Sequence, residues 1–147
     1  TDASSATPEG EALDRSEWLV KASMSYDLAG DLPERAIDGV LATRWTTGEI
    51  QSSGMWFEID FGSEQSVSRV ELELEGKSSD DYPRGYRLRV APDDGELGPV
   101  IAQDIAVDGT SPTVIEFPQQ SVRRIRVVQI GSSDEFWWSI SEINAYE

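Results

Sequence analysis

The chain has 147 residues, 38% of them hydrophobic, and its 28 acidic and 12 basic residues give a formal net charge of −16. This length fits one domain with a single core, and the negative charge works against binding to nucleic acid or anionic lipid. Because cysteine and histidine are both absent, disulfides, thiolate nucleophiles and Ser-His-Asp arrangements are excluded.

The first residues differ in composition from the rest. Residues 1–12 are small, polar and acidic, and we expect a flexible linker or tail there. A single packed module is expected over residues 13–147, with its dense part beginning near Trp18. No apolar run approaches the roughly 18–20 residues of a membrane span. The acidic, lysine-poor composition fits a secreted protein from a saline habitat, and we expect a mature or excised chain because the N-terminus is not signal-like.

Alternating apolar and polar residues predict β-strands along most of the remaining chain. In chain order the candidates are MWFEIDFG (55–62), SRVELELEG (68–76), YRLRVAPDDG (86–95), SPTVIEFP (111–118), RRIRVVQIG (123–131) and ISEINAYE (140–147). We expect Pro112 and Pro118 to mark strand ends or edges, and one helical turn after Pro33. Many short strands with frequent turns predict an all-β sandwich or barrel.

Parity along these candidates predicts which side chains face the core. In 55–62 the expected inward set is Phe57, Ile59 and Phe61, and the expected outward set is Trp56, Glu58 and Asp60. If 68–76 and 86–95 are neighbouring strands, their outward glutamates and arginines can pair across strands on a solvated face.

Two adjacent tryptophans precede the last candidate strand. Neighbouring strand residues point to opposite faces, so only one of Trp137 and Trp138 can enter the core. Trp138 shares its parity with Ile140, and we expect it to pack inward while Trp137 faces outward. A bulge in the preceding loop would reverse this assignment.

The segment RAIDGVLATRW (35–45) predicts a specialised loop. Asp38 and Gly39, followed by Thr43, can turn carbonyl and hydroxyl oxygens inward, and Ca²⁺ takes six to eight such oxygens. An Asp-Gly pair is also a common plain turn, so these residues alone leave both readings open.

Six segments taken together resemble the successive signatures of the discoidin, or factor V/VIII type C, fold. They are AIDGVLATRWTTG, WFEIDFG, VSRVELE, DYPRGYRLRVAPDDG, RRIRVVQIG and WWSISEINAY. The pattern is most similar to bacterial carbohydrate-binding modules of family 32, and it runs from about Trp18 to Tyr146. The resemblance implies an all-β, eight-stranded jelly-roll β-sandwich of galactose-binding-like type, with its two ends close together.

The resemblance also implies one structural Ca²⁺ ion. By position, its ligands would be the carbonyls of Arg35, Val40 and Ser141, the carboxylates of Asp38 and Glu142, and the carbonyl and hydroxyl of Thr43. The family often has Asn or Asp where Val40 stands, but only a carbonyl is needed there. The ion would clamp the last strand to an early loop, because two buried carboxylates would otherwise repel or take up a proton. The alternative is that Glu142 is an ordinary exposed glutamate.

In the resembling modules, sugars bind in a shallow cleft of loops, on an aromatic platform with a few polar groups. Loop residues of that chemistry here are Tyr26, Asp27, Glu49, Asp81, Tyr82, Arg84, Glu135, Phe136 and Trp137. Each can instead pack a loop, as Arg84 would by pairing with Asp80 or Asp81. Galactose-binding members commonly use a histidine that this chain lacks, so β-glucan and chitosan-type oligosaccharides are the candidate ligands.

The function implied is that of a non-catalytic module that targets a secreted, bacterial glycoside hydrolase or polysaccharide lyase to its glycan. We expect a monomer, linked covalently to a catalytic domain, with no nucleic-acid or membrane partner. Two alternatives stay open. One is a discoidin module for protein or cell-surface adhesion without sugar binding, and the other is an enzyme that uses paired carboxylates.

Overall fold

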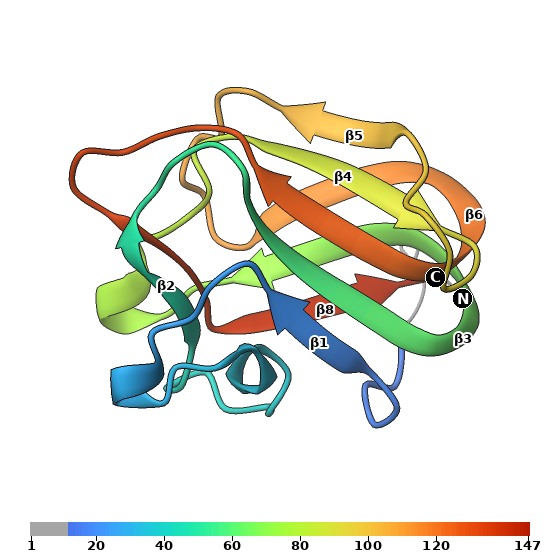
Figure 1. Ribbon diagram of the computed structural model, residues 1–147, viewed down its shortest axis with the longest axis horizontal. Helices are drawn as coiled ribbons and strands as arrows, with labels where there is room; N and C mark the ends of the chain where they lie inside the picture. Colours follow the sequence, from blue (N-terminus) through green and yellow to red (C-terminus); the bar gives the residue numbers. More distant parts are fainter. Residues whose placement is uncertain (1–11) are drawn as a thin grey trace, which may run out of the picture.

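The computed structural model describes residues 12–147, so the predicted tail, apart from Ala12, lies outside the described residues. Within them the chain forms eight strands and three short 3-10 helices (Figure 1). The strands are β1 (Leu19–Ala22), β2 (Trp45–Ile50), β3 (Met55–Glu73), β4 (Tyr86–Ala91), β5 (Val100–Asp104), β6 (Thr113–Gln129), β7 (Trp137–Ile140) and β8 (Glu142–Tyr146). The helices are η1 (Asp27–Ala29), η2 (Pro33–Ala36) and η3 (Gly76–Ser78). None of the described helices is long and apolar enough to cross a membrane.

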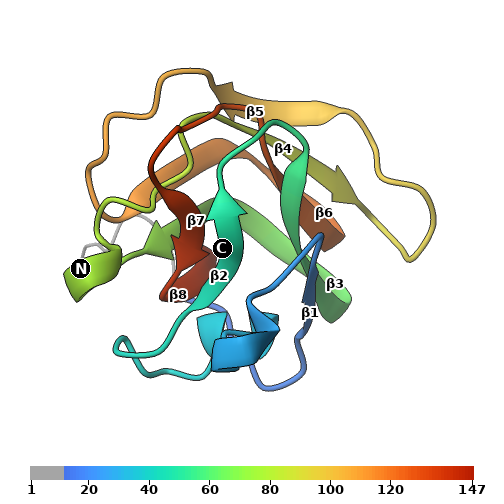
Figure 2. The same ribbon diagram turned by 60° about the vertical axis from the view of Figure 1, so that its left-hand side comes forward.

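The strands form one large and one small sheet, and every pairing between them is antiparallel. The large sheet has the order β1-β3-β6-β4-β5, with β8 also paired to β3, and β2 pairs with β7 alone. In Figure 2, β4 and β5 lie on one side of the molecule, and β2, β7 and β8 lie toward the other. Apolar side chains fill the space between the two layers. The predicted all-β, eight-stranded jelly-roll sandwich is confirmed.

Two pairs of predicted strands are each one long strand in the structure. Segments 55–62 and 68–76 join in β3, while 111–118 and 123–131 join in β6. The two long strands pair along most of their length, and their register shifts between Asp60 and Gln65 and again between Val67 and Arg69. Pro118 therefore does not end a strand, but β6 pairs with β3 alone at this point because β4 pairs only with residues 124–129, so the predicted edge position is confirmed. Pro118 lies inside β6 at the second irregularity, where the ladder needs no N–H from it.

The core follows the predicted parity of β3. Phe57, Ile59 and Phe61 are buried, as expected. Glu58 was expected to face outward, and it is nevertheless only 3% exposed because the Arg126 guanidinium lies 2.8 Å from its carboxylate and covers it. Arg126 also stacks over the Trp56 ring at 3.9 Å. The outer face of this sheet is thus partly closed by its own charged side chains.

The expected cross-strand pairing of glutamates in 68–76 with arginines in 86–95 does not occur through neighbouring strands. β6 lies between β3 and β4, so the two segments never pair directly. The sequence pattern also missed β1, β2 and β5, which are short and lie outside the long alternating runs. The helical turn predicted after Pro33 is confirmed as η2.

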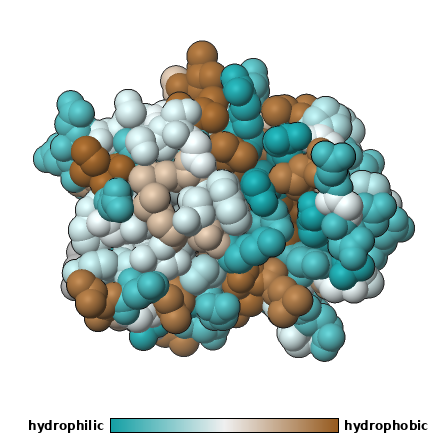
Figure 3. Space-filling view, viewed as in Figure 1, coloured by the Kyte–Doolittle hydropathy of each residue, from teal (hydrophilic) through white to brown (hydrophobic). Residues whose placement is uncertain are grey.

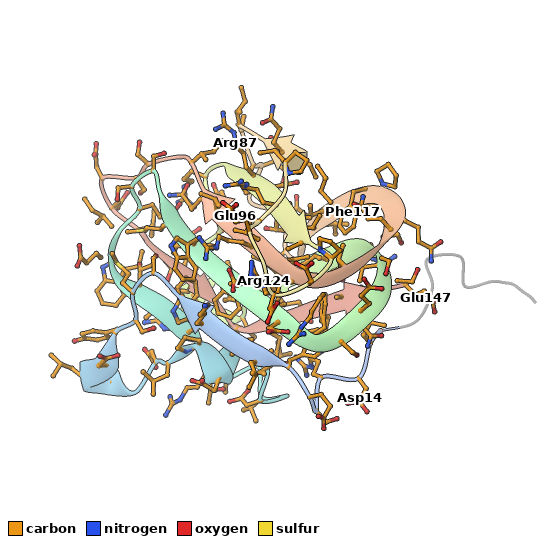
Figure 4. The ribbon with its side chains drawn as sticks, turned by 45° about the vertical axis from the view of Figure 1, so that its right-hand side comes forward. Asp14, Arg87, Glu96, Phe117, Arg124 and Glu147 are labelled. Carbon is orange, nitrogen blue, oxygen red and sulfur yellow. The ribbon has the colours of Figure 1, made fainter. Side chains whose placement is uncertain are left out.

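The two ends of the described chain lie side by side. The Leu13 N–H donates to the Ala145 carbonyl at 2.8 Å, and Ala12 bridges Tyr146 in antiparallel fashion. Figure 4 shows Asp14 and Glu147 on the same side of the molecule, and Figure 1 shows β2 at the opposite end. The expected closeness of the chain ends is therefore confirmed.

Candidate functional site

The two adjacent tryptophans separate as their parity predicts. Trp138 is fully buried and packs edge-on against Trp45, with ring centroids 4.9 Å apart. Trp137 is half-buried at the start of β7, and its ring meets Tyr26 edge-on at 5.2 Å. The prediction that Trp138 faces the core and Trp137 faces outward is confirmed.

Tyr26 reaches Trp137 because β2 leaves room for it. Gly48 has a positive φ of 73°, and a Cβ at that position would lie 2.9 Å from the Tyr26 Cβ. Any other residue at position 48 would be strained and would push the tyrosine away. A glycine in β2 thus sets the place of one aromatic ring beside the other.

Arg44 lies at the centre of this surface, although no local sequence pattern marks it as a site residue. Its guanidinium is 5.7 Å from the centre of the Trp137 ring. Its Nε is 3.5 Å from the Asp31 carboxylate, and its Nη1 is 3.2 Å from the Asp81 carboxylate. Nη1 also donates to the Ser78 hydroxyl at 2.9 Å. Arg44 therefore joins three loops around the exposed tryptophan, and its fixed charge orients the polar groups there.

Two shallow hollows flank Trp137, and both are lined by Trp137 and Arg44. The first, of about 450 Å³, is also bordered by Tyr26, Asp31, Arg35 and Glu75. The second, of about 320 Å³, is also bordered by Asp81, Glu135 and Phe136. Four carboxylates and two guanidinium groups surround the pair of hollows, so the local charge is −2.

Figure 3 shows the hydropathy of the face seen in Figure 1. Its left half, the side on which β2 lies, is mostly pale, whereas strongly hydrophilic residues gather on the right. Pale colour marks residues of intermediate hydropathy, and hydrophobic residues appear as separate groups. This end of the molecule is therefore amphipathic, with no continuous apolar patch on the face shown.

Five of the nine predicted ligand-binding residues lie together in these hollows: Tyr26, Asp81, Glu135, Phe136 and Trp137. The other four, Asp27, Glu49, Tyr82 and Arg84, line neither of them. Asp27 lies on η1 and Glu49 on β2, and both are exposed.

Arg84 braces its loop. The guanidinium stacks on Tyr82 at 3.8 Å and lies 5.2 Å from the Phe136 ring centre. Its Nη1 donates to the carbonyls of Asp80 and Tyr82, both at 2.8 Å. The arginine thereby holds Phe136 against the loop at the edge of the second hollow.

Asp81 lies below the surface and is 7% exposed. Its carboxylate accepts a hydrogen bond from the Ser139 hydroxyl at 2.6 Å and faces Arg44. Burial raises the pKa of Asp81, and the Ser139 hydrogen bond and the Arg44 charge offset only part of that effect. The aspartate is thus a buried anchor for Arg44 as well as part of the wall of the hollow.

We expect the Asp81→Asn variant to lose one component of the pH dependence of stability. The folded state binds the Asp81 proton more tightly than the unfolded state. The free energy of unfolding therefore falls as the pH rises from 3.8, the ordinary value, through the higher folded pKa. Urea unfolding at several pH values measures the difference in unfolding free energy between wild type and variant, and the wild type should lose stability relative to the variant as the pH rises through this range. A constant difference across that range would contradict the assignment.

The loop at 35–43 gathers oxygen atoms as its sequence predicts. The Thr43 hydroxyl donates to the Asp38 carboxylate and lies 3.0 Å from the Val40 carbonyl. The Val40 N–H donates to the other oxygen of Asp38 at 2.9 Å. Burial acts to raise the pKa of Asp38, but the hydrogen bonds from Thr43 and Val40 outweigh it and the pKa lies below its usual value. The Asp38 carboxylate is therefore ionised at neutral pH. It is also exposed, so the expectation of two buried carboxylates is wrong for Asp38.

Glu142 brings the last strand to this loop. It is 4% exposed, so the alternative of an ordinary exposed glutamate is wrong. Its carboxylate accepts from the Gly39 N–H at 3.1 Å and lies within hydrogen-bonding reach of Asp38. Arg15, which no sequence motif marks, forms an ion pair with it. Burial raises the pKa of Glu142, and Arg15 opposes that shift.

The other two predicted metal ligands flank this cluster. Ser141 is buried, and its N–H donates to the Glu73 carbonyl at 2.8 Å. The Arg35 side chain turns to Asp31, 3.4 Å away, which leaves only its carbonyl as a metal ligand. Among the described residues no three carboxylate-type side chains form a metal cluster. A hard cation would therefore depend on carbonyl and hydroxyl oxygens around the two carboxylates, which is a donor set that Ca²⁺ accepts.

A family model described as the NedA-like, galactose-binding domain of the F5/F8 type C group matches residues 35–127. No protein of a curated collection matches the chain.

Solved structures with this fold cover almost the whole chain. The CBM32 of AlyQ, in complex with 4,5-unsaturated mannuronic acid, is 27% identical with a TM-score of 0.73, over 93% of this chain and 98% of that one. Chitosan-binding module 2 of a Paenibacillus sp. IK-5 chitosanase/glucanase, in complex with chitotriose, is 28% identical with a TM-score of 0.74. The match covers 89% of this chain and 97% of that one. The family 32 module of C. perfringens NanJ, in complex with galactose, is 19% identical with a TM-score of 0.78, over 92% and 98%, and shows the shared fold alone.

Proposed function

Because this chain belongs to the NedA-like, galactose-binding family of F5/F8 type C domains, we propose that it is a non-catalytic carbohydrate-binding module. The observation that carries the proposal is Trp137, half-exposed between two polar hollows at one end of the sandwich. An aromatic ring in such a place can stack on the apolar face of a sugar while nearby charged groups bind its hydroxyls.

The charge around Trp137 favours an amino sugar over a uronate. Asp31, Glu75, Asp81 and Glu135 outnumber Arg35 and Arg44, and Arg44 is already paired with two of the carboxylates. Glu75 and Glu135 form no ion pair with another described residue, so they can accept an ammonium group or sugar hydroxyls. The likeness to a chitosan-binding module agrees with this choice, and neutral β-glucan oligomers are the second candidate.

Isothermal titration calorimetry tests the proposal with chitotriose, β-1,3- and β-1,4-glucan oligomers, galactose and a mannuronate oligomer. We expect the largest heat from chitotriose, and weaker binding at high salt because the contacts are charged. If every sugar is silent while the protein is folded, the proposed function is wrong. If the mannuronate oligomer binds most tightly, the ligand class is wrong but the function stands.

We propose that the loop at 35–43 and β8 hold one structural Ca²⁺ ion. Its ligands would be Asp38, Thr43 and Glu142 through side chains, and Arg35, Val40, Thr43 and Ser141 through carbonyls. Asp38 and Glu142 support this because their carboxyl groups lie within reach of each other while Arg15 forms its ion pair with Glu142 alone, so a cation between them would offset the remaining repulsion. The ion would supply fixed positive charge that ties the last strand to the early loop.

We expect Ca²⁺ to raise the thermal midpoint of the wild-type protein. An ion at about 100 times its dissociation constant stabilises by about 2.7 kcal/mol, and the effect should shrink in Asp38→Asn. Thermal unfolding with Ca²⁺ and with a chelator measures it, and Asp94→Asn, in an exposed loop, is the matched control. An unchanged midpoint, or equal responses in all three proteins, would contradict the calcium site.

The function proposed for the whole protein is targeting. A weak site gains effect when it holds a linked catalytic domain near its polysaccharide, because the second contact becomes intramolecular. The secreted, bacterial origin and the glycoside hydrolase or lyase partner expected from the sequence belong to this proposal. We also propose that the domain itself is a monomer, since its charge of −16 opposes self-association.

Adhesion to a protein partner is the second candidate function. Leu28 on η1 is 91% exposed, and Leu32, Val40 and Leu41 are also exposed in the neighbouring loops. Leu28→Ser would weaken capture of a protein partner but leave sugar binding unchanged, and this difference separates the two functions.

A further inference from the structure

A third hollow, of about 330 Å³, lies where β4 begins, β5 ends and β6 begins. It shares no lining residue with the two hollows around Trp137. Figure 2 shows one of its borders, the orange loop that leaves β5 and returns to β6. The apolar part of its wall comes from Val107, Pro112 and Val114, and its polar part comes from Tyr86, Asp104, Asp108, Thr110 and Thr113.

The Tyr86 side chain offers an unpartnered hydroxyl group to a ligand in this hollow. Its ring belongs to the core and only 7% of the residue is exposed, yet its hydroxyl has no hydrogen-bond partner among residues 12–147. Thr113 on the facing strand is also 7% exposed, and its hydroxyl likewise has no partner within the described chain. Neither hydroxyl is among the buried unpaired polar atoms of the described chain, so both stay open to the hollow, where a ligand or water can bond to them.

The carboxylates give the hollow its acceptors. Asp104 accepts the Ala106 N–H at 2.9 Å through one oxygen, and Asp108 accepts the Thr110 N–H at 2.9 Å in the same way. Asp108 also accepts a side-chain hydrogen bond from Thr110, whereas the second oxygen of Asp104 accepts none from a described residue. Burial and the neighbouring Asp104 charge raise the pKa of Tyr86, so its hydroxyl keeps its proton and acts as a donor.

We propose that this hollow, the Tyr86 pocket, is a second sugar site that takes one pyranose unit of a neutral or amino sugar. A pyranose offers hydroxyl or ammonium donors for Asp104 and Asp108 and an oxygen acceptor for Tyr86. Its C–H face fits the apolar wall of Val107 and Pro112. The two carboxylates disfavour a uronate by like-charge repulsion, and the apolar wall of Val107 and Pro112 suits a sugar ring better than a bare cation.

The Tyr86 pocket lies close to the Trp137 surface. The Val107 N–H donates to the Arg84 carbonyl at 3.3 Å, and the Arg84 guanidinium packs against Phe136 of the second hollow. The module would therefore hold two sites at one end, and two weak contacts to one polysaccharide multiply their effect.

Titration with chitotriose, followed by amide NMR shifts, tests the Tyr86 pocket separately from the Trp137 surface. In the wild type we expect two groups of shifting signals, one near Trp137 and one in residues 104–113. Tyr86→Phe removes a single oxygen, so the second group should respond with an affinity about three- to tenfold weaker while the first is unchanged. Thr113→Val should act in the same way, and Tyr146→Phe, at the opposite end, is the matched control. Thermal unfolding establishes that each variant is folded.

The outcomes separate this proposal from the proposed function. If signals of 104–113 stay fixed with chitotriose and with cellotriose up to about 10 mM, the Tyr86 pocket is not a sugar site. Equal affinity in wild type and Tyr86→Phe would also overturn it. If Trp137→Ala removes both groups together, the two sites are not separate and the proposal fails while the proposed function stands. Shifts confined to 104–113 in the wild type would support the Tyr86 pocket and contradict the Trp137 surface.

Discussion

Replacement of Trp137 by alanine should abolish most of the sugar binding and leave the protein folded. The ring is the half-exposed aromatic group between the two hollows, with Tyr26 edge-on to it and Arg44 over its face. A stacked aromatic ring is a typical centre of binding energy, so we expect the dissociation constant for chitotriose to rise at least about tenfold, or about 1.4 kcal/mol. Calorimetry on wild type and variant measures the change.

The matched control is Trp56→Ala. Trp56 is also half-buried and also stacked by an arginine, Arg126 at 3.9 Å, but it lies on the outer face of the large sheet. Its loss should leave the affinity unchanged. Trp137→Phe should retain part of the binding, because a smaller ring still offers a stacking face. If Trp56→Ala and Trp137→Ala weaken binding equally, the effect is one of stability and the Trp137 surface is not the site.

The neighbouring substitution, Trp138→Ala, should have the opposite effect and unfold much of the protein. Trp138 is completely buried and its ring packs against Trp45, which in turn packs against Phe57 at 5.0 Å. Removing a buried tryptophan costs about 3–5 kcal/mol, and a domain of this size holds only about 5–15 kcal/mol in total. Urea unfolding followed by circular dichroism measures the loss.

The Trp138→Phe variant separates the effect of the indole N–H from that of the ring volume. The indole N–H of Trp138 is buried without a hydrogen-bond partner in the described chain, so phenylalanine removes an unpaired donor while it keeps most of the ring volume. We expect it to cost less than about 2 kcal/mol and to leave sugar affinity intact. An unfolding midpoint of Trp138→Ala equal to that of the wild type would show that the core does not depend on this side chain.

Local parity explains which parts of the fold could be predicted. The alternation in 55–61 identified Phe57, Ile59 and Phe61 as core, since a strand with one buried face must alternate. The union of two segments into β3 could not be predicted, because Gly62 and the polar residues after it have the composition of a turn. Only the pairing with β6, which resumes at Gln65 after a register shift, keeps the strand continuous.

Those parts of the site that depend on adjacent residues could be predicted. Those that depend on residues far apart in the sequence could not. Parity separated Trp137 from Trp138. Arg44 contacts Asp81, 37 positions away, and Arg15 contacts Glu142, 127 positions away, so no local pattern marks either arginine. The Tyr86 pocket escaped notice for a related reason. Parity places Tyr86 in the core, but only the course of the loop between β5 and β6 decides whether its hydroxyl finds a partner.

The pairing of Ala12 with Tyr146 has a mechanical consequence. Ala12 and Tyr146 pair in antiparallel fashion, so the described chain starts and finishes at the same end of this bridge. If the two ends were pulled in opposite directions, the hydrogen bonds between them would break one after another, starting at Ala12 and Tyr146. Tension would enter and leave at the end remote from β2, so the loops around Trp137 would keep their shape until β8 itself peeled away from β3.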